Sequence, residues 1–153
     1  MTTSSGFGKV IVITDAGSDT GEAIARHLAS QGHRVMLGAR SLERIAALAR
    51  DIARSGGVAS YQEVDVSSRG SVRAFLVIAE VCFERIDVLV NTAGSGIVAA
   101  LPVIEAQGVA RVIHVPTDHA LHARAIAEAI GCAVAQPDHL DVGEILMRTA
   151  ARA

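Results

Sequence analysis

The sequence alternates between short unbroken apolar runs and longer segments in which apolar residues recur every three or four positions. A short unbroken run is typical of a buried strand, and the wider spacing is typical of a helix with one buried face. The runs predict strands at 10–14, 34–37, 59–66, 86–90, 111–115 and 144–148. The spaced segments predict helices between Gly21 and Gly32, between Ser41 and Gly56, and at 68–83, 102–107 and 117–135.

Predicted strands and helices therefore follow one another along most of the chain. Strands joined by helices of this length pair in parallel through right-handed crossovers, and helices then cover both faces of the sheet. The predicted fold class is α/β, a Rossmann-like doubly wound parallel sheet of about six strands. Because domains commonly hold about 100–200 residues, we expect a single domain over 1–153, with 1–8 as a flexible tail.

Composition and charge exclude several classes of function. Lys and Arg number 14 against 16 Asp and Glu, the net charge is -2, and aromatic residues make up 3% of the chain. With neither a basic run nor aromatic side chains on which bases could stack, a nucleic-acid binder is excluded. No apolar run approaches the roughly 18 residues that a membrane span needs. Cys82 and Cys132 stand in no metal-ligand spacing, and 1–8 lack the features of a secretory signal, so we expect a cytoplasmic protein without a metal.

Several short motifs stand in register along the chain. The first strand runs into Thr14-Asp15-Ala16-Gly17-Ser18-Asp19-Thr20-Gly21, a strand, turn and helix of the kind that binds dinucleotides at a helix N-terminus. Further motifs are Gly38-Ala39-Arg40, Asp65-Val66, Asn91-Thr92-Ala93-Gly94 after the fourth strand, 101–115, Gln136-Pro137 and 141–148. Together they resemble the NADP-preferring branch of the short-chain dehydrogenase/reductase family over nearly the whole chain.

The resemblance implies a set of residues that bind NADP. Arg40 would hold the adenosine 2′-phosphate and Asp65 would contact the adenine, although a solvated arginine and a strand-end cap are the alternatives. Asn91, Ala93 and Gly94 would line the ribose on the nicotinamide side, or serve the turn structurally. The remaining cofactor-binding candidates are Gly17, Gly21 and Val66.

The phosphate loop departs from the family pattern TGxxxGxG. Asp15 and Asp19 replace its first two glycines, and a carboxylate about 4 Å from a phosphate costs on the order of 4 kcal/mol at an effective dielectric near 20. We therefore expect NADPH to bind weakly or not at all. In the alternative interpretations, Asp19 is the helix N-cap and Gly17 partly replaces the lost glycines.

The family's catalytic pair has no counterpart in the sequence. Family members reduce carbonyls with a Tyr and a Lys spaced Tyr-x-x-x-Lys, together with a Ser and an Asn. The single Tyr61 lies in the third predicted strand and the single Lys9 opens the first, so the two cannot share a helix. Thr117 aligns with the Ser and is either a weak catalytic candidate or a helix cap.

A second group of polar residues surrounds the end of the fifth predicted strand. It consists of His114, Asp118, His119 and His122, with Asp118 and His122 one helical turn apart. Such residues can form an acid/base pair or ligate a metal. An exposed first helical turn explains them equally, and His119 and His122 stay weak catalytic candidates.

The third predicted helix has unusually few polar residues. From 74 to 83 every residue except Glu80 is apolar, whereas a helix with one solvated face carries polar residues on its outer side. Val77, Ile78 and Val81 are therefore expected to be covered, either by a second chain or by the segment 97–104. The edge of the last predicted strand also favours association.

Three functions follow from these observations. The first is a truncated relative of the short-chain dehydrogenases that lacks reductase activity and acts as a homodimer or as the partner of a full-length relative. The second is an enzyme of another class, an isomerase, cyclase or lyase, that uses the crevice at the sheet edge. The third is a residual NADPH-dependent oxidoreductase with a proton donor from outside the chain.

Overall fold

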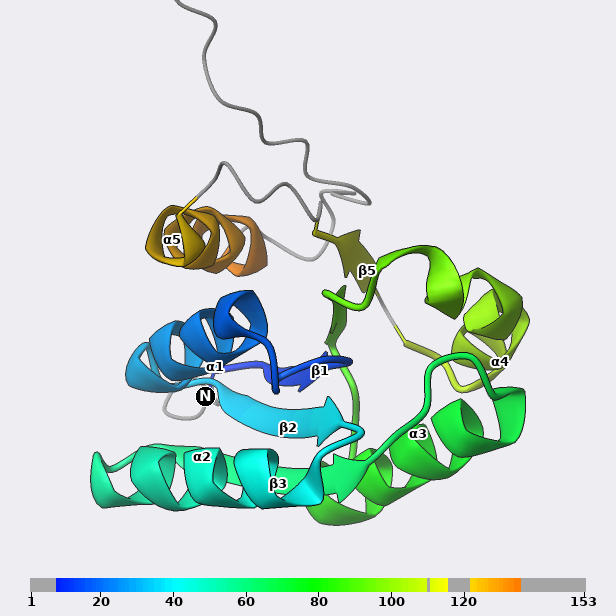
Figure 1. The fold of residues 1–153 in the computed structure, drawn as a ribbon, viewed down its shortest axis with the longest axis horizontal. Helices are drawn as coiled ribbons and strands as arrows, with labels where there is room; N and C mark the ends of the chain where they lie inside the picture. Colours follow the sequence, from blue (N-terminus) through cyan, green and yellow to red (C-terminus); the bar gives the residue numbers. More distant parts are fainter. Residues whose placement is uncertain (1–7, 110, 116–121, 136–153) are drawn as a thin grey trace, which may run out of the picture.

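The computed structural model describes residues 8–109, 111–115 and 122–135. Their centre is a parallel sheet of five strands in the order β3-β2-β1-β4-β5 (Figure 1). The strands are β1 (Val10–Ile13), β2 (Arg34–Ala39), β3 (Val58–Glu63), β4 (Val88–Asn91) and β5 (Arg111–His114). This arrangement confirms the predicted Rossmann-like α/β class, since the strand order reverses direction beside β1.

Helices cover both faces of the sheet. On one face lie α1 (Asp19–Ser30), α2 (Leu42–Arg54) and α5 (Ala123–Val134), and on the other lie α3 (Arg69–Phe83), the 3₁₀ helix η2 (Gly94–Ala100) and α4 (Leu101–Ala106). Figure 1 shows α5 beside α1, far from it in sequence. None of the helices in 8–109, 111–115 and 122–135 is long and apolar enough to cross a membrane.

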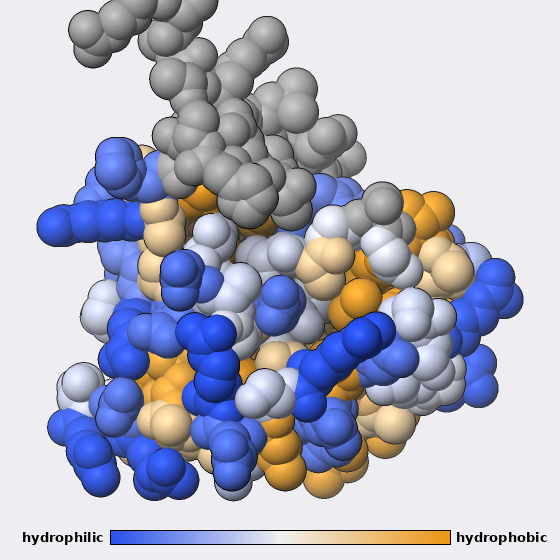
Figure 2. Space-filling view, in the orientation of Figure 1, coloured by the Kyte–Doolittle hydropathy of each residue, from blue (hydrophilic) through white to orange (hydrophobic). Residues whose placement is uncertain are grey.

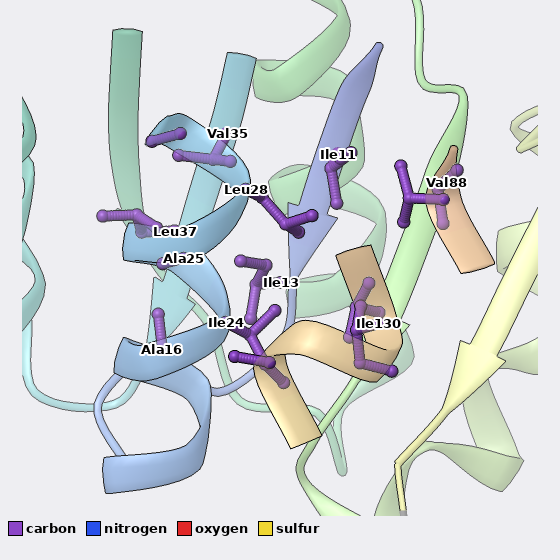
Figure 3. Close-up of a cluster of buried hydrophobic side chains, with 14 of the residues drawn as sticks. Ile11, Ile13, Ala16, Ile24, Ala25, Leu28, Val35, Leu37, Val88 and Ile130 are labelled. Atoms are coloured by element: carbon purple, nitrogen blue, oxygen red, sulfur yellow. The ribbon is translucent and has the colours of Figure 1, made fainter. Parts of the chain in front are cut away.

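The alternation of side chains along the strands divides the core into two clusters. Ile11 and Ile13 of β1 point toward α1 and α5, where Ile24, Leu28 and Ile130 meet them (Figure 3). Val10 and Val12 point to the opposite face, toward α3, η2 and α4. All residues of β1, β2 and β4 except Arg34 are buried, which is the pattern of strands covered on both faces.

The predicted boundaries differ most from the structure at β3 and α5. Strand β3 ends at Glu63 rather than at residue 66, because Val64 leaves the ladder with one backbone bond to Ala39 and the chain turns at Asp65. Helix α5 begins at Ala123, with His122 at its N-cap position, rather than one and a half turns earlier. The predicted strand 144–148 and the helix start at Thr117 lie outside the described residues.

Candidate functional site

An open cleft of about 450 Å³ lies at the carboxyl ends of β1 and β2, where doubly wound sheets bind ligands. Its walls come from the loop after β1, from the start of α2 and from the segment after β3. The lining residues are Thr14, Asp15, Gly17, Ser18, Ala39, Arg40, Ser41, Arg44, Val64, Val66 and Ala93. A second hollow of about 370 Å³ shares Arg40 and Val64 with the cleft and is lined further by Glu63, Asp65 and Ser71.

Ser18, and not Asp19, caps helix α1. The Ser18 hydroxyl accepts a hydrogen bond from the Gly21 N–H (3.0 Å) and donates one to the Asp15 carbonyl (3.1 Å). The expectation that Asp19 is the N-cap is therefore wrong. The reason is register: the helix starts at Asp19, so the hydroxyl that reaches the first-turn N–H belongs to the preceding residue.

Gly21 is required in the first turn of α1 for a steric reason. A Cβ built on Gly21 would lie 1.8 Å from the Asp15 carbonyl oxygen and 2.9 Å from Cα of Ala16. Only glycine allows the first turn of α1 to pass so close to the loop. Gly17 has no such requirement, because its Cβ would first meet Ala39 at 3.3 Å and the Asp15 carboxylate at 3.6 Å.

The two aspartates of the loop differ in their surroundings. Asp15 is half-buried and lines the cleft next to Gly17. Asp19 has a side chain that is 98% exposed, and its carboxylate lies 3.7 Å from Nη2 of Arg44 on α2. Of the two aspartates, Asp15 therefore places its negative charge on the cleft wall. Asp19 lies outside the cleft and offsets part of the positive charge of Arg44.

Arg40 and Asp65 form an ion pair at the point where the cleft and the second hollow meet. Nη2 of Arg40 donates to Oδ1 of Asp65 (3.0 Å), and the same oxygen accepts from the hydroxyl (2.6 Å) and the N–H (3.0 Å) of Ser67. These bonds from Ser67, reinforced by Arg40, lower the pKa of the Asp65 carboxyl below its usual value. Asp65 thus stays ionised, and Arg40 keeps a carboxylate partner.

Asn91 is a buried hydrogen-bonding centre at the end of β4. Its Oδ1 accepts from the Thr14 hydroxyl (3.0 Å) and from the Ala93 N–H (3.2 Å), while Nδ2 donates to the Gly94 carbonyl (3.0 Å) and faces Nδ1 of His114 (3.2 Å). These four bonds connect the ends of β1, β4 and β5 and use both atoms of the amide. The geometry shows a structural role for Asn91, and its contact with a cofactor ribose stays a prediction.

The partners of Asn91 also define the tautomer of a neutral His114 ring. The Ala93 N–H can only donate, so it fixes Oδ1 of Asn91 as an acceptor and Nδ2 as a donor. Nδ1 of His114 must then accept, which leaves the proton of a neutral ring on Nε2. His114 is thus engaged at the sheet end by one ring nitrogen.

The remaining candidates are dispersed or lie outside the described residues. Lys9 Nζ donates to the Val134 carbonyl (2.8 Å) at the start of β1, and Tyr61 lies 42% exposed on the edge strand β3. His122 is exposed before α5 and its side chain makes no capping bond. Thr117, Asp118 and His119 lie outside the described residues, so the predicted cluster around them stays a prediction.

The sequence interpretation missed two residues of the cleft. Arg44 lies in the first turn of α2 and lines the same cleft as Arg40, which precedes the helix. Ser18 stands three residues before Gly21, the spacing of an N-cap and its N–H donor. Across the part of the chain that the structure describes, no group of three or more His, Cys, Asp or Glu side chains is arranged to hold a metal ion.

Comparison with known proteins identifies the family. A model of the short chain dehydrogenase family matches residues 9–128. The chain is 44% identical over 86 residues to the putative ketoacyl reductase of the monensin polyketide synthase from Streptomyces virginiae, an alignment that covers 56% of this chain and 33% of the relative. The chain belongs to the short-chain dehydrogenase/reductase family, as its motifs predict.

Solved structures agree on the fold. A metagenomic short-chain oxidoreductase in complex with NADP matches with a TM-score of 0.78 at 24% identity, covering 97% of this chain and 100% of that one. An actinorhodin polyketide ketoreductase with NADPH matches with a TM-score of 0.66 at 23% identity, covering 89% of this chain and 68% of that one. The chain spans about a third of the length of the curated relatives it matches.

Proposed function

We propose that this chain is a member of the family without reductase activity of its own, which retains part of the NADP site and acts as a homodimer or as the partner of a full-length relative. The observation that carries the proposal is that the single Lys and the single Tyr of the chain lie away from the cleft and apart from each other. The cleft lies at the carboxyl ends of β1 and β2, whereas Lys9 begins the opposite end of β1 and Tyr61 lies on the edge strand. Without a Tyr-x-x-x-Lys pair, the chain supplies no proton to a carbonyl.

The cleft fits one end of NADP better than the rest. Arg40 and Arg44 lie on its rim, and guanidinium groups suit a phosphate ester such as the adenosine 2′-phosphate. Asp15 lines the same cleft beside the N-terminus of α1, where the family's glycines would admit the pyrophosphate. In a complete family member, bound NADPH would supply a hydride. In this chain, the cleft residues would bind only the adenosine end of the cofactor.

The proposed association rests on α3. Val81 is 79% exposed and Val77 43% exposed, one turn apart on the helix surface. Ile78 is half-buried and packs against the cluster that η2 and α4 help to form. The segment 97–104 therefore covers Ile78 in part and leaves Val77 and Val81 exposed. Figure 2 shows a face that is mostly polar with smaller apolar patches. Val77 and Val81 are large apolar side chains exposed on one helix, which favours a partner.

The test is a titration combined with an activity assay. The purified chain is expected to oxidise no NADPH in the presence of ketone substrates, and to bind NADPH weakly, yet about tenfold or more tightly than NADH because one charged contact contributes roughly 1.5–3 kcal/mol. Arg40→Ala with Arg44→Ala should abolish this preference, and Arg54→Ala with Arg124→Ala, at two exposed arginines outside the cleft, serves as the charge-matched control. Carbonyl reduction by homogeneous protein would overturn the proposal.

A further inference from the structure

Strand β3 forms one edge of the sheet and lacks the features that usually protect an edge strand. In the described part of the chain only β2 pairs with it, along an unbroken parallel register from Val58 to Glu63 (Figure 1). The strand contains no proline, lysine or bulge, and its one charged residue is Glu63 at the end. Val58 and Tyr61 are 43% and 42% exposed. An edge strand of this kind is a template for pairing with another strand.

The outer side of β3 presents the backbone groups of every second residue. The Val64 N–H donates to the Ala39 carbonyl of β2, and backbone groups alternate in direction along a strand, so the even-numbered residues of β3 point their N–H and C=O groups toward β2. The same groups of Ala59, Tyr61 and Glu63 therefore point away from the sheet. These three residues offer a row of donors and acceptors that no described residue pairs with.

We infer that β3 pairs antiparallel with β3 of a second copy of this chain, about a two-fold axis at Tyr61, so that the two sheets become continuous. The inference rests on the association in the proposed function and adds the surface and the register that produce it. In an antiparallel pair, residues that exchange hydrogen bonds both point toward the partner strand, so the axis passes through a residue. With the axis at Tyr61, Ala59 lies opposite Glu63 of the second copy, and all three outward residues are paired.

The neighbouring registers use fewer of the free backbone groups. An axis one residue earlier would place Glu63 opposite Gly57, whose N–H already donates to the Ile52 carbonyl (2.9 Å). An axis one residue later would place Ala59 opposite Asp65, whose N–H already donates to a hydroxyl of α3 (2.9 Å). Because a backbone group left without a partner between two strands costs stability, the central register is favoured.

The charges at the two ends of β3 also suit a second copy. Arg54 ends α2 close to the start of β3, and its side chain is 77% exposed. Glu63 is exposed at the other end of the strand and forms no ion pair within the described residues. Its side chain lies on the face that α2 covers, because Ala59, two pairs along the strand, packs against the core cluster of that face. Antiparallel pairing therefore brings Glu63 of each copy toward Arg54 of the other.

The exposed valines of α3 lie beside the same edge. Sγ of Cys82 lies 3.8 Å from the hydroxyl oxygen of Ser60, which places the last turns of α3 next to the middle of β3. Val81 directly precedes Cys82 and is 79% exposed. A two-fold axis at Tyr61 therefore brings the end of α3 toward its counterpart in the second copy, and strand pairing extends the surface on which the proposed association rests.

Disulfide crosslinking of the full chain tests the register, in a background where Cys82 and Cys132 are replaced by Ser. Tyr61→Cys places its thiol at the axis, where paired Cα atoms lie about 5.5 Å apart and can be bridged. Val58→Cys is the matched control, because it is equally exposed on the same strand but lies about 20 Å from its counterpart in this register. With diamide as the oxidant, Tyr61→Cys is expected to give about tenfold or more covalent dimer than Val58→Cys on a non-reducing gel.

Two results overturn the inference. One is the absence of a disulfide in Tyr61→Cys, and the other is equal crosslinking of the two variants, which would indicate random collision. The mass of the wild-type chain separates this failure from that of the proposed function. A dimer that does not crosslink at Tyr61 rejects strand pairing and keeps the association through α3, whereas a monomer of 15.8 kDa rejects the homodimer itself.

Discussion

At the scale of single residues, Asn91 shows how a motif can persist for structural reasons. It is buried at the end of β4 and makes four hydrogen bonds, to groups at the ends of two other strands and in the following turn. Asn91→Ala would leave the Thr14 hydroxyl and the Ala93 N–H without this acceptor in a buried environment. We expect a loss of about 2–4 kcal/mol in the free energy of unfolding, measured by urea denaturation.

The variant Asn91→Asp is the graded control for this prediction. An ionised carboxylate keeps both acceptor bonds but loses the two donor bonds to Gly94 and His114. Its stability should lie between those of the wild type and Asn91→Ala. Equal stability of all three proteins would show that the network contributes little.

His33 gives a prediction for the pH dependence of stability. Its Nδ1 accepts from the Lys9 N–H (3.0 Å), and burial together with the charge of Lys9 lowers the pKa of the ring below its usual value. As pH falls below about 6.5, His33 binds a proton in the unfolded chain but not in the folded chain. The stability that the neutral His33 contributes is therefore fully present above that pH, and it is lost as pH falls toward the lower pKa of the folded state. Urea midpoints measured at closely spaced pH values should fall across this window.

The matched variant for that prediction is His33→Asn, which supplies a side-chain acceptor without a titrating ring. It should flatten the pH dependence in this window even where it lowers overall stability. A slope unchanged by the substitution would assign the effect to one of the other histidines.

At the scale of elements, the contact between α1 and its preceding loop depends on Gly21. Gly21→Ala would force the Asp15 carbonyl away from an atom that would otherwise lie 1.8 Å from it. Because this neighbour is backbone, we expect a loss of about 2–4 kcal/mol in thermal or urea unfolding. Gly70 occupies the first turn of α3 with no atom within 4 Å of its missing Cβ, so Gly70→Ala should be neutral or stabilising by up to about 1 kcal/mol. Similar losses in both variants would refute the steric explanation.

At the scale of the whole molecule, the exposed valines of α3 predict an assembly. Light scattering coupled to size exclusion should give at least twice the chain mass of 15.8 kDa. Val77→Glu with Val81→Glu should dissociate the dimer, since two charges would be buried without partners. Leu42→Glu, at an exposed apolar residue of α2 on the other face of the sheet, should leave the mass unchanged. A monomer at micromolar concentration would leave a heteromeric partner as the proposed association.

The sequence by itself determined the fold class and the family. The unbroken run at β1, the helical spacing of Ile24, Leu28 and their neighbours, and the turn after Asn91 are local patterns that require no knowledge of distant contacts. The absence of a Tyr-x-x-x-Lys pair follows from counting a single Tyr61 and a single Lys9. Such features depend on which residues are neighbours along the chain, and periodicity reports them directly.

Only the tertiary structure decided which charges meet. It brought Arg44 to the cleft and paired it with Asp19, gave the cap of α1 to Ser18, and joined Asn91 to Thr14 and His114 across strands. It also decided that Asp15, and not Asp19, lines the cleft. Side-chain direction at a loop depends on where the helix starts and on contacts between segments remote in sequence, and hydrophobic patterning carries no information on either.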